Sequence, residues 1–173
     1  MKNFDKDSSA YKAVLLGIMC AICGLVLSVV NSITDPIIKE AELAEVKANL
    51  EIMFPGTSYE EIKDFTDESG LIQSVYRAKD QGVVFKIHAV GYNSNGFTFM
   101  TGIADDGRVA GYMVLEHGET NGIGSRAFED DYISKVTSLN AGDDVPLLTG
   151  ATLTSTAVKT GIEAAYKVFD AVK

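Results

Sequence analysis

Hydroxyl side chains gather around one glycine near the C-terminal end of the sequence, in the run LTGATLTS at residues 148–155. The apolar residues that follow have helical spacing, so the run falls at the start of a predicted helix. Free backbone N–H groups and the helix dipole favour an anion at such a start. The run is therefore typical of a site that holds a phosphate, and the Thr152 hydroxyl could be esterified to one. The simpler interpretation is that the hydroxyls only cap the helix.

A second polar loop precedes this run, with the sequence EHGETNGIGSR at residues 116–126. Its glycines allow the backbone to turn sharply or to approach a flat ligand. Glu119 and Thr120 place polar groups beside them. An ordinary surface loop is the alternative interpretation.

Strand signals between residues 74 and 116 predict an antiparallel sheet. Alternating apolar residues predict strands over 74–77, 83–90, 97–104 and 109–116. Asp105-Asp106-Gly107 between the last two predicts a hairpin. With helices on either side of it in sequence, the sheet gives an α+β fold.

Two helices are predicted to flank the sheet, over residues 37–53 and 155–172. A cap at Thr34 or Asp35, with Pro36 in the first turn, is expected to start the first helix. The polar stretch 57–70 is predicted to form a short helix or an irregular connection.

An uncharged segment, AVLLGIMCAICGLVLSVVNSIT, occupies residues 13–34. A helix of roughly 20 mostly apolar residues crosses a bilayer. A signal peptide is the competing interpretation, but its apolar core is only ~7–15 residues long and ends in small residues. We therefore predict a cytoplasmic N-terminus (1–12), a transmembrane helix (13–34), a connecting helix (35–56) and an extracytoplasmic domain (57–173).

The charges on either side of this segment predict its orientation in the cell membrane, which is the inner membrane in a cell that has two membranes. Lys2, Lys6 and Lys12 precede it, and lysines stay on the cytoplasmic side. Residues 35–173 contain 12 Lys and Arg against 22 Asp and Glu, a net charge of −10. Such an acidic domain repels phosphate backbones, so nucleic acid is not an expected partner, whereas membrane lipid is.

Both cysteines of the chain, Cys20 and Cys23, lie in the uncharged segment, so no disulfide is expected in the outer domain. At a spacing of three residues they share one helix face, where packing against neighbouring helices is the favoured interpretation. A thiolate pair near a metal centre shared with other subunits is the alternative, because two thiolates do not complete a metal site. His88 and His117 are far apart in sequence, so the domain itself is not expected to build one.

Together the two polar loops resemble the FMN-binding domain family, in which FMN is attached through its phosphate to a threonine. The family pattern is a strand, then H-x-E-T-x-G-x-G, then [ST]-G-A-[ST]. This chain matches both halves, in GIADDGRVAGYMVLEHGETNGIGSR and TGATLTSTAV. With its N-terminal anchor, the chain is similar to the family of G subunits of Rnf ion-translocating electron-transfer complexes.

The resemblance assigns residues of this chain to a flavin site. It implies that Thr152 carries the FMN and that Thr149, Gly150 and Ala151 form the motif before it. It also implies that the second loop lines the isoalloxazine ring, through Glu119, Thr120, Gly122, Ile123 and Gly124. The chain departs from the family at Pro146, where an acidic residue commonly belongs to the signal for the attaching enzyme; Asp143 and Asp144 lie just upstream.

The resemblance implies an electron carrier without a catalytic residue or turnover of its own. Its partners are the other membrane and peripheral subunits of a complex that couples reduced ferredoxin and NAD to transport of Na⁺ or H⁺. A separate flavin transferase, using FAD and a divalent metal, attaches the FMN. Two alternatives are a C subunit of the Na⁺-translocating NADH:quinone reductase, although the chain is short for one, and an anchored extracytoplasmic binding domain without a redox role.

Overall fold

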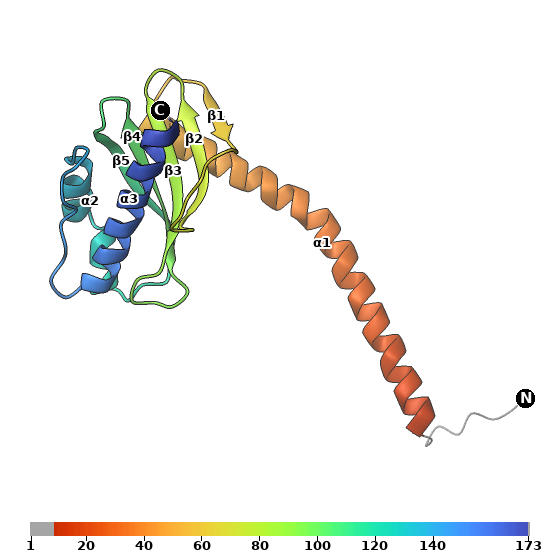
Figure 1. Cartoon of the computed structure of the whole chain (residues 1–173). Helices are drawn as coiled ribbons and strands as arrows, with labels where there is room; N and C mark the ends of the chain where they lie inside the picture. Colours follow the sequence, from red (N-terminus) through yellow and green to blue (C-terminus); the bar gives the residue numbers. More distant parts are fainter. Residues whose placement is uncertain (1–8, 173) are drawn as a thin grey trace, which may run out of the picture. The chain divides into compact units, whose positions relative to one another are not determined.

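The protein consists of two compact units, Met1–Ala48 and Asn49–Lys173 (Figure 1). The structure is a computed structural model that describes residues 9–172, with the side chains at positions 10, 36–43 and 45 left aside. The second unit contains the sheet and the two predicted loops.

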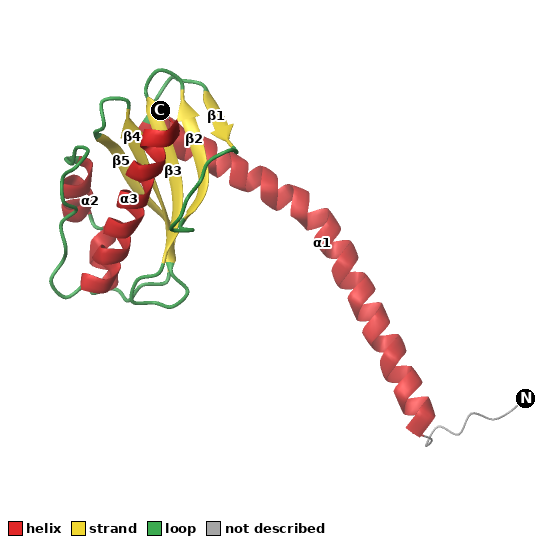
Figure 2. Ribbon diagram, viewed as in Figure 1, coloured by secondary structure: helices red, strands yellow, loops and turns green. Residues whose placement is uncertain are grey.

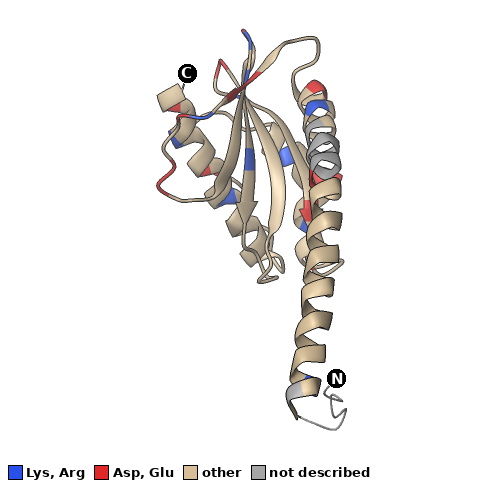
Figure 3. Cartoon of the chain, turned by 90° about the vertical axis from the view of Figure 1, so that its right-hand side faces the viewer, with Lys and Arg blue, Asp and Glu red and all other residues tan. Residues whose placement is uncertain are grey.

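The first unit is formed by most of helix α1 (Ser9–Met53). Its segment Tyr11–Asp35 has a mean hydropathy of 2.8 and no buried residue, so it is long and apolar enough to cross a membrane. In Figure 3 this part of α1 carries almost no charged residue, whereas charges follow it along the helix. The segment coincides closely with the predicted span 13–34.

The helix continues through Pro36, so the prediction of a new helix capped at Thr34 or Asp35 was wrong. The Thr34 hydroxyl donates to the Val30 carbonyl at 2.8 Å, and the Ser32 hydroxyl donates to the Ser28 carbonyl at 2.9 Å. These hydroxyls bond to the preceding turn and therefore do not cap a new one.

Five antiparallel strands form a sheet in the order β1-β2-β3-β4-β5 (Figure 2). Their bounds are β1 (Tyr59–Ile62), β2 (Ile72–Ala78), β3 (Gly82–Ala89), β4 (Phe97–Ala104) and β5 (Val109–His117). The predicted hairpin is confirmed, since Gly107 has a φ of 89° and its N–H donates to the Ala104 carbonyl at 2.8 Å. The α+β fold with an antiparallel sheet is likewise confirmed.

Strand β1 lies in the stretch predicted to be a short helix or irregular, and that prediction was wrong. Its sequence YEEI has no apolar alternation to reveal it, and β1 is an edge strand that pairs only with β2. The Tyr59 hydroxyl donates to the Leu50 carbonyl at 2.7 Å, which holds the start of β1 to the end of α1.

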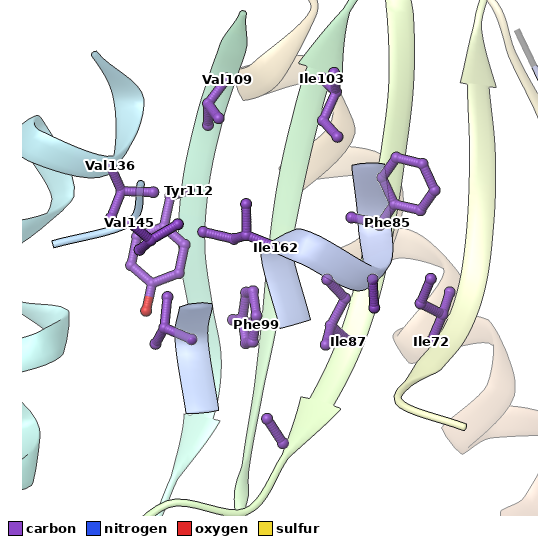
Figure 4. Packing of buried hydrophobic residues seen from close by; sticks show 14 of the residues in the cluster. Ile72, Phe85, Ile87, Phe99, Ile103, Val109, Tyr112, Val136, Val145 and Ile162 are labelled. Carbon is purple, nitrogen blue, oxygen red and sulfur yellow. The ribbon is translucent and has the colours of Figure 1, made fainter. Parts of the chain in front are cut away.

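Helix α3 (Thr152–Val172) covers one face of the sheet, and the main core lies between them (Figure 4). The predicted inward residues are all buried: Val158, Ile162, Ala165, Val168 and Phe169. Gly161 lets the helix approach closely, because a Cβ there would lie 2.7 Å from the Phe99 ring and 3.0 Å from Ile87. The helix begins at Thr152, three residues before the predicted start.

The opposite face of the sheet receives the C-terminal end of α1. Gly82, Gly102 and Gly111 leave room there for Met53 and Phe54, because a Cβ at any of the three would lie within 3.1 Å of one of these side chains. The last residues of α1 are therefore fixed to the sheet unit by close packing.

A 3-10 turn, η1 (Gly124–Phe128), and a short helix, α2 (Asp130–Thr137), follow β5. Neither was predicted. Helix α2 buries only Tyr132 and Val136. One apolar pair at helical spacing in a polar segment is too weak a pattern to predict a helix. The Tyr132 ring packs nearly perpendicular to the Tyr112 ring of β5, with 6.4 Å between the ring centroids.

The hydroxyl of Tyr132 makes the sheet unit sensitive to alkaline pH. Burial raises the pKa of Tyr132 to about 12, whereas an unfolded tyrosine ionises near pH 10. Above about pH 10 the folded state therefore binds more protons, and the free energy of unfolding falls as the pH rises to about 12. We expect Tyr132→Phe to reduce the fall in the free energy of unfolding between pH 8 and pH 11, measured by denaturant titration at the two pH values.

Burial also raises the pKa of Tyr112 well above its usual value, so Tyr112→Phe serves as a comparison at neutral pH only. The Tyr112 hydroxyl donates to the Ala127 carbonyl at 3.2 Å, whereas the Tyr132 hydroxyl has no hydrogen-bond partner in the described part of the chain. At pH 7 we expect Tyr112→Phe to lose about 1 kcal/mol and Tyr132→Phe to lose none. Equal losses in the two variants would contradict this interpretation.

Candidate functional site

The segment before α3 is a tight turn that presents Thr152 on the surface. Gly150 has a φ of 86°, a conformation that favours glycine, and the Ala151 N–H donates to the Leu148 carbonyl at 3.0 Å. Thr152 is the first residue of α3 and is exposed. Its hydroxyl donates a long hydrogen bond, of 3.3 Å, to the Leu148 carbonyl. The hydroxyl oxygen is therefore accessible at a helix N-terminus.

The neighbouring hydroxyls have internal partners. The Ser155 hydroxyl accepts from the Leu148 N–H at 3.0 Å and donates to the Ala151 carbonyl at 2.9 Å, so it closes the turn against the helix. Ser155 and Thr154 are 0% and 1% exposed. Ser155 therefore fastens the turn to the first turn of α3 without capping a helix N–H, whereas Thr149 and Thr152 are exposed at the surface.

Glu119 is a buried carboxylate that ties three segments together. It is 5% exposed, and it accepts from the Thr154 hydroxyl in the first turn of α3 and from the Asn93 N–H in the β3–β4 loop, each at 3.1 Å. A Cβ at Gly91 or at Gly124 would lie within 2.5 Å of its oxygens. Only glycine fits at these two positions without a rearrangement.

The structure thus brings the two sequence-predicted loops side by side. Gly124 packs against Thr154, because a Cβ there would lie 2.9 Å from the threonine hydroxyl. Thr120 and Gly122 are exposed, and Ile123 is 49% exposed. These three form an exposed surface of the loop whose Glu119 and Gly124 contact Thr154. Glu119 differs, since both of its oxygens serve contacts within the protein.

Arg126 is a site residue that the sequence analysis missed. It lies in η1, and its guanidinium donates from Nη1 to the Thr149 carbonyl at 3.0 Å. The same nitrogen lies 3.5 Å from where a Cβ of Gly150 would be. The sequence places Arg126 two residues after the Gly-Ile-Gly segment, but only the fold brings it to the hydroxyl run 23 residues later.

The two histidines make other contacts in the sheet unit. The His88 ring lies 3.1 Å from the Thr98 hydroxyl across β3 and β4, and the exposed His117 ring packs 4.7 Å from Phe128. Cys20 and Cys23 are exposed on α1. Across the residues that the structure describes, no group of three or more His, Cys, Asp or Glu side chains could hold a metal ion.

These features together fit a flavin phosphate. An exposed hydroxyl stands at a helix N-terminus, a glycine keeps the preceding turn free of side chains, and a guanidinium lies on the same turn. Residues 91–167 match the family of FMN-binding domains. The match includes the β3–β4 loop, both predicted loops and most of α3.

Over nearly its whole length, the chain is also similar to G subunits of ion-translocating complexes. It is 24% identical over 180 residues to the G subunit of the proton-translocating ferredoxin:NAD⁺ oxidoreductase complex of Clostridium ljungdahlii, covering 94% of both chains. It is 27% identical to the G subunit of the ion-translocating oxidoreductase complex of Stutzerimonas stutzeri, covering 91% of this chain and 79% of the relative. It is 23% identical to the G subunit of the Na⁺-translocating ferredoxin:NAD⁺ oxidoreductase complex of Acetobacterium woodii, covering 98% of both. The resemblance predicted from the two loops is confirmed.

Proposed function

We propose that this chain is the G subunit of an Rnf-type ion-translocating oxidoreductase complex, and that FMN esterified to Thr152 relays electrons between the other subunits. The observation that carries the proposal is the exposed Thr152 hydroxyl at the start of α3, beside the loop 119–124. Similarity to G subunits along both the apolar helix and the domain supports it.

Attachment of the flavin is a phosphoryl transfer that needs a second enzyme. A threonine hydroxyl is a weak nucleophile, and no titratable group of this chain is hydrogen-bonded to Thr152 among the described contacts. We propose that a flavin transferase supplies the base. The Thr152 oxygen then bonds to the phosphorus of FAD that carries the riboflavin side, the bond to the second phosphate breaks, and AMP leaves as the hydroxyl loses its proton.

The ester fixes the cofactor where the chain can orient it. When bound, the isoalloxazine ring supplies the electron-transfer chemistry, and the protein sets its position and surroundings. The surface of Thr120, Gly122 and Ile123 is available to one face of the ring. No general acid or base is needed for electron relay.

We further propose that the segment Tyr11–Asp35 anchors the chain in the membrane, with the lysines before it in the cytoplasm and the sheet unit outside. One of the relatives is named for protons and another for Na⁺, so the proposal leaves the transported ion as either of the two. The partners are the other subunits of the complex, the transferase and membrane lipid.

A colour test distinguishes a covalent carrier from an anchored binding domain. The full chain, purified from a host that has the transferase, is precipitated with acid and washed. We expect the pellet to stay yellow and to fluoresce as a band in a denaturing gel. A colourless pellet from such a host would overturn the proposal and favour a domain without a redox role.

A further inference from the structure

We propose that Arg126 binds the phosphate of the FMN ester and is needed for efficient attachment of the flavin to Thr152. This inference rests on the proposed function. Arg126 is held on the turn that precedes Thr152, through its 3.0 Å hydrogen bond to the Thr149 carbonyl. A guanidinium carries five N–H donors in a planar fork that suits phosphate oxygens.

The other two arginines of the chain are already paired with carboxylates. Arg77 lies 3.1 Å from Asp105, and Arg108 lies 3.1 Å from Asp106. Among the described residues, Arg126 has no carboxylate partner and is exposed, and it spends one of its N–H groups on the Thr149 carbonyl. The remaining donors of this guanidinium are therefore available to an anion at the start of α3.

Electrostatics explains why a cation is required at this place. The chain has a net charge of −9, and the Glu119 carboxylate already lies within hydrogen-bond distance of the first turn of α3. The ester at Thr152 adds another negative charge to the same turn. A helix dipole equivalent to about half a charge does not balance two anions, whereas one guanidinium adds a full positive charge.

Gly150 contributes to the same arrangement. Its left-handed φ of 86° favours glycine. Its missing side chain leaves a space beside the Arg126 guanidinium, because a Cβ at Gly150 would lie 3.5 Å from Nη1 of Arg126. The turn thus has a cation on one side and the Thr152 hydroxyl after it. This geometry favours an anion bound between the two.

The rate of flavin attachment tests the role of Arg126. The full chain in detergent micelles is incubated with purified transferase, FAD and Mg²⁺, and covalent flavin is followed by fluorescence in denaturing gels. We expect Arg126→Gln to slow attachment about tenfold or more, as the loss of a charge-assisted hydrogen bond implies. Arg126→Lys keeps the positive charge but lacks the planar fork of donors. Its attachment rate is expected to lie between those of the wild type and Arg126→Gln.

The matched control is Arg108→Gln, which removes an exposed arginine of the β4–β5 turn. It is expected to leave the rate unchanged. An Arg126→Gln rate equal to that of the wild type would overturn the inference while the proposed function stands. A wild-type chain that gains no covalent flavin would overturn both.

A second measurement needs no change at Arg126 and so does not depend on how its variants fold. The three arginines of the chain are labelled with ¹⁵N, and their Nε–H signals are compared between the flavin-bearing wild type and Thr152→Ala. We expect the Arg126 signal to shift and those of Arg77 and Arg108 to stay. An Arg126 signal at the same position in both samples would overturn the inference.

Discussion

Replacement of Thr152 by alanine is expected to abolish covalent flavin, the largest effect predicted for any single substitution in this chain. The ester requires an exposed hydroxyl at the start of α3, and Thr152 provides it. Its neighbours Thr154 and Ser155 are buried and bonded within the protein, so neither can replace it. The measurement is in-gel flavin fluorescence per mole of purified chain.

Thr156 provides the matched control, because it is an exposed threonine one turn further along α3. We expect Thr156→Ala to keep the full amount of flavin. Retained fluorescence in Thr152→Ala, or its loss in Thr156→Ala, would move the attachment point away from Thr152. Either outcome would refute the assignment while leaving the fold unchanged.

Replacement of Glu119 by alanine is expected to be the most destabilising change at the site. It leaves the half-buried Asn93 N–H and the buried Thr154 hydroxyl without their shared acceptor. Hydrogen bonds to a charged group contribute about 1.5–3 kcal/mol, so we expect a loss of about 3 kcal/mol or more. Denaturant unfolding followed by tyrosine fluorescence measures it, since the chain has no tryptophan.

Two further variants separate this role from the loss of a surface charge. Glu119→Gln can still accept from Asn93, and the Thr154 hydroxyl can rotate to accept from the new amide, so we expect it to keep most of the stability and the flavin. Glu116→Ala, at an exposed position near the end of β5, is expected to change neither. A wild-type stability in Glu119→Ala would contradict the structural role.

The sequence was sufficient for the elements with strong periodicity. Strands β3 to β5 form where the apolar patterns predicted them, and the apolar stripe of α3 is buried, because these residues pack in the core. Strand β1 and helix α2 have little such pattern; β1 pairs with β2, and α2 buries only one pair of residues. The continuity of α1 through Pro36 also has no local signal.

The candidate site was predictable in its residues but not in their roles. The motifs identify Thr152 and the loop 119–124, and the fold places these segments together. The sequence does not show that the Glu119 carboxylate faces the protein interior, because that depends on Asn93 and Thr154 from distant segments. Arg126 was missed for the same reason, as its partner lies 23 residues away.

The most direct test of this account is mass spectrometry of one peptide. Trypsin releases residues 136–159 between Lys135 and Lys159, and this peptide contains every hydroxyl discussed for the start of α3. In protein from a host with the transferase, we predict the added mass of one FMN ester, located at Thr152 by fragmentation. An unmodified peptide, or FMN on another residue, would contradict the central claim.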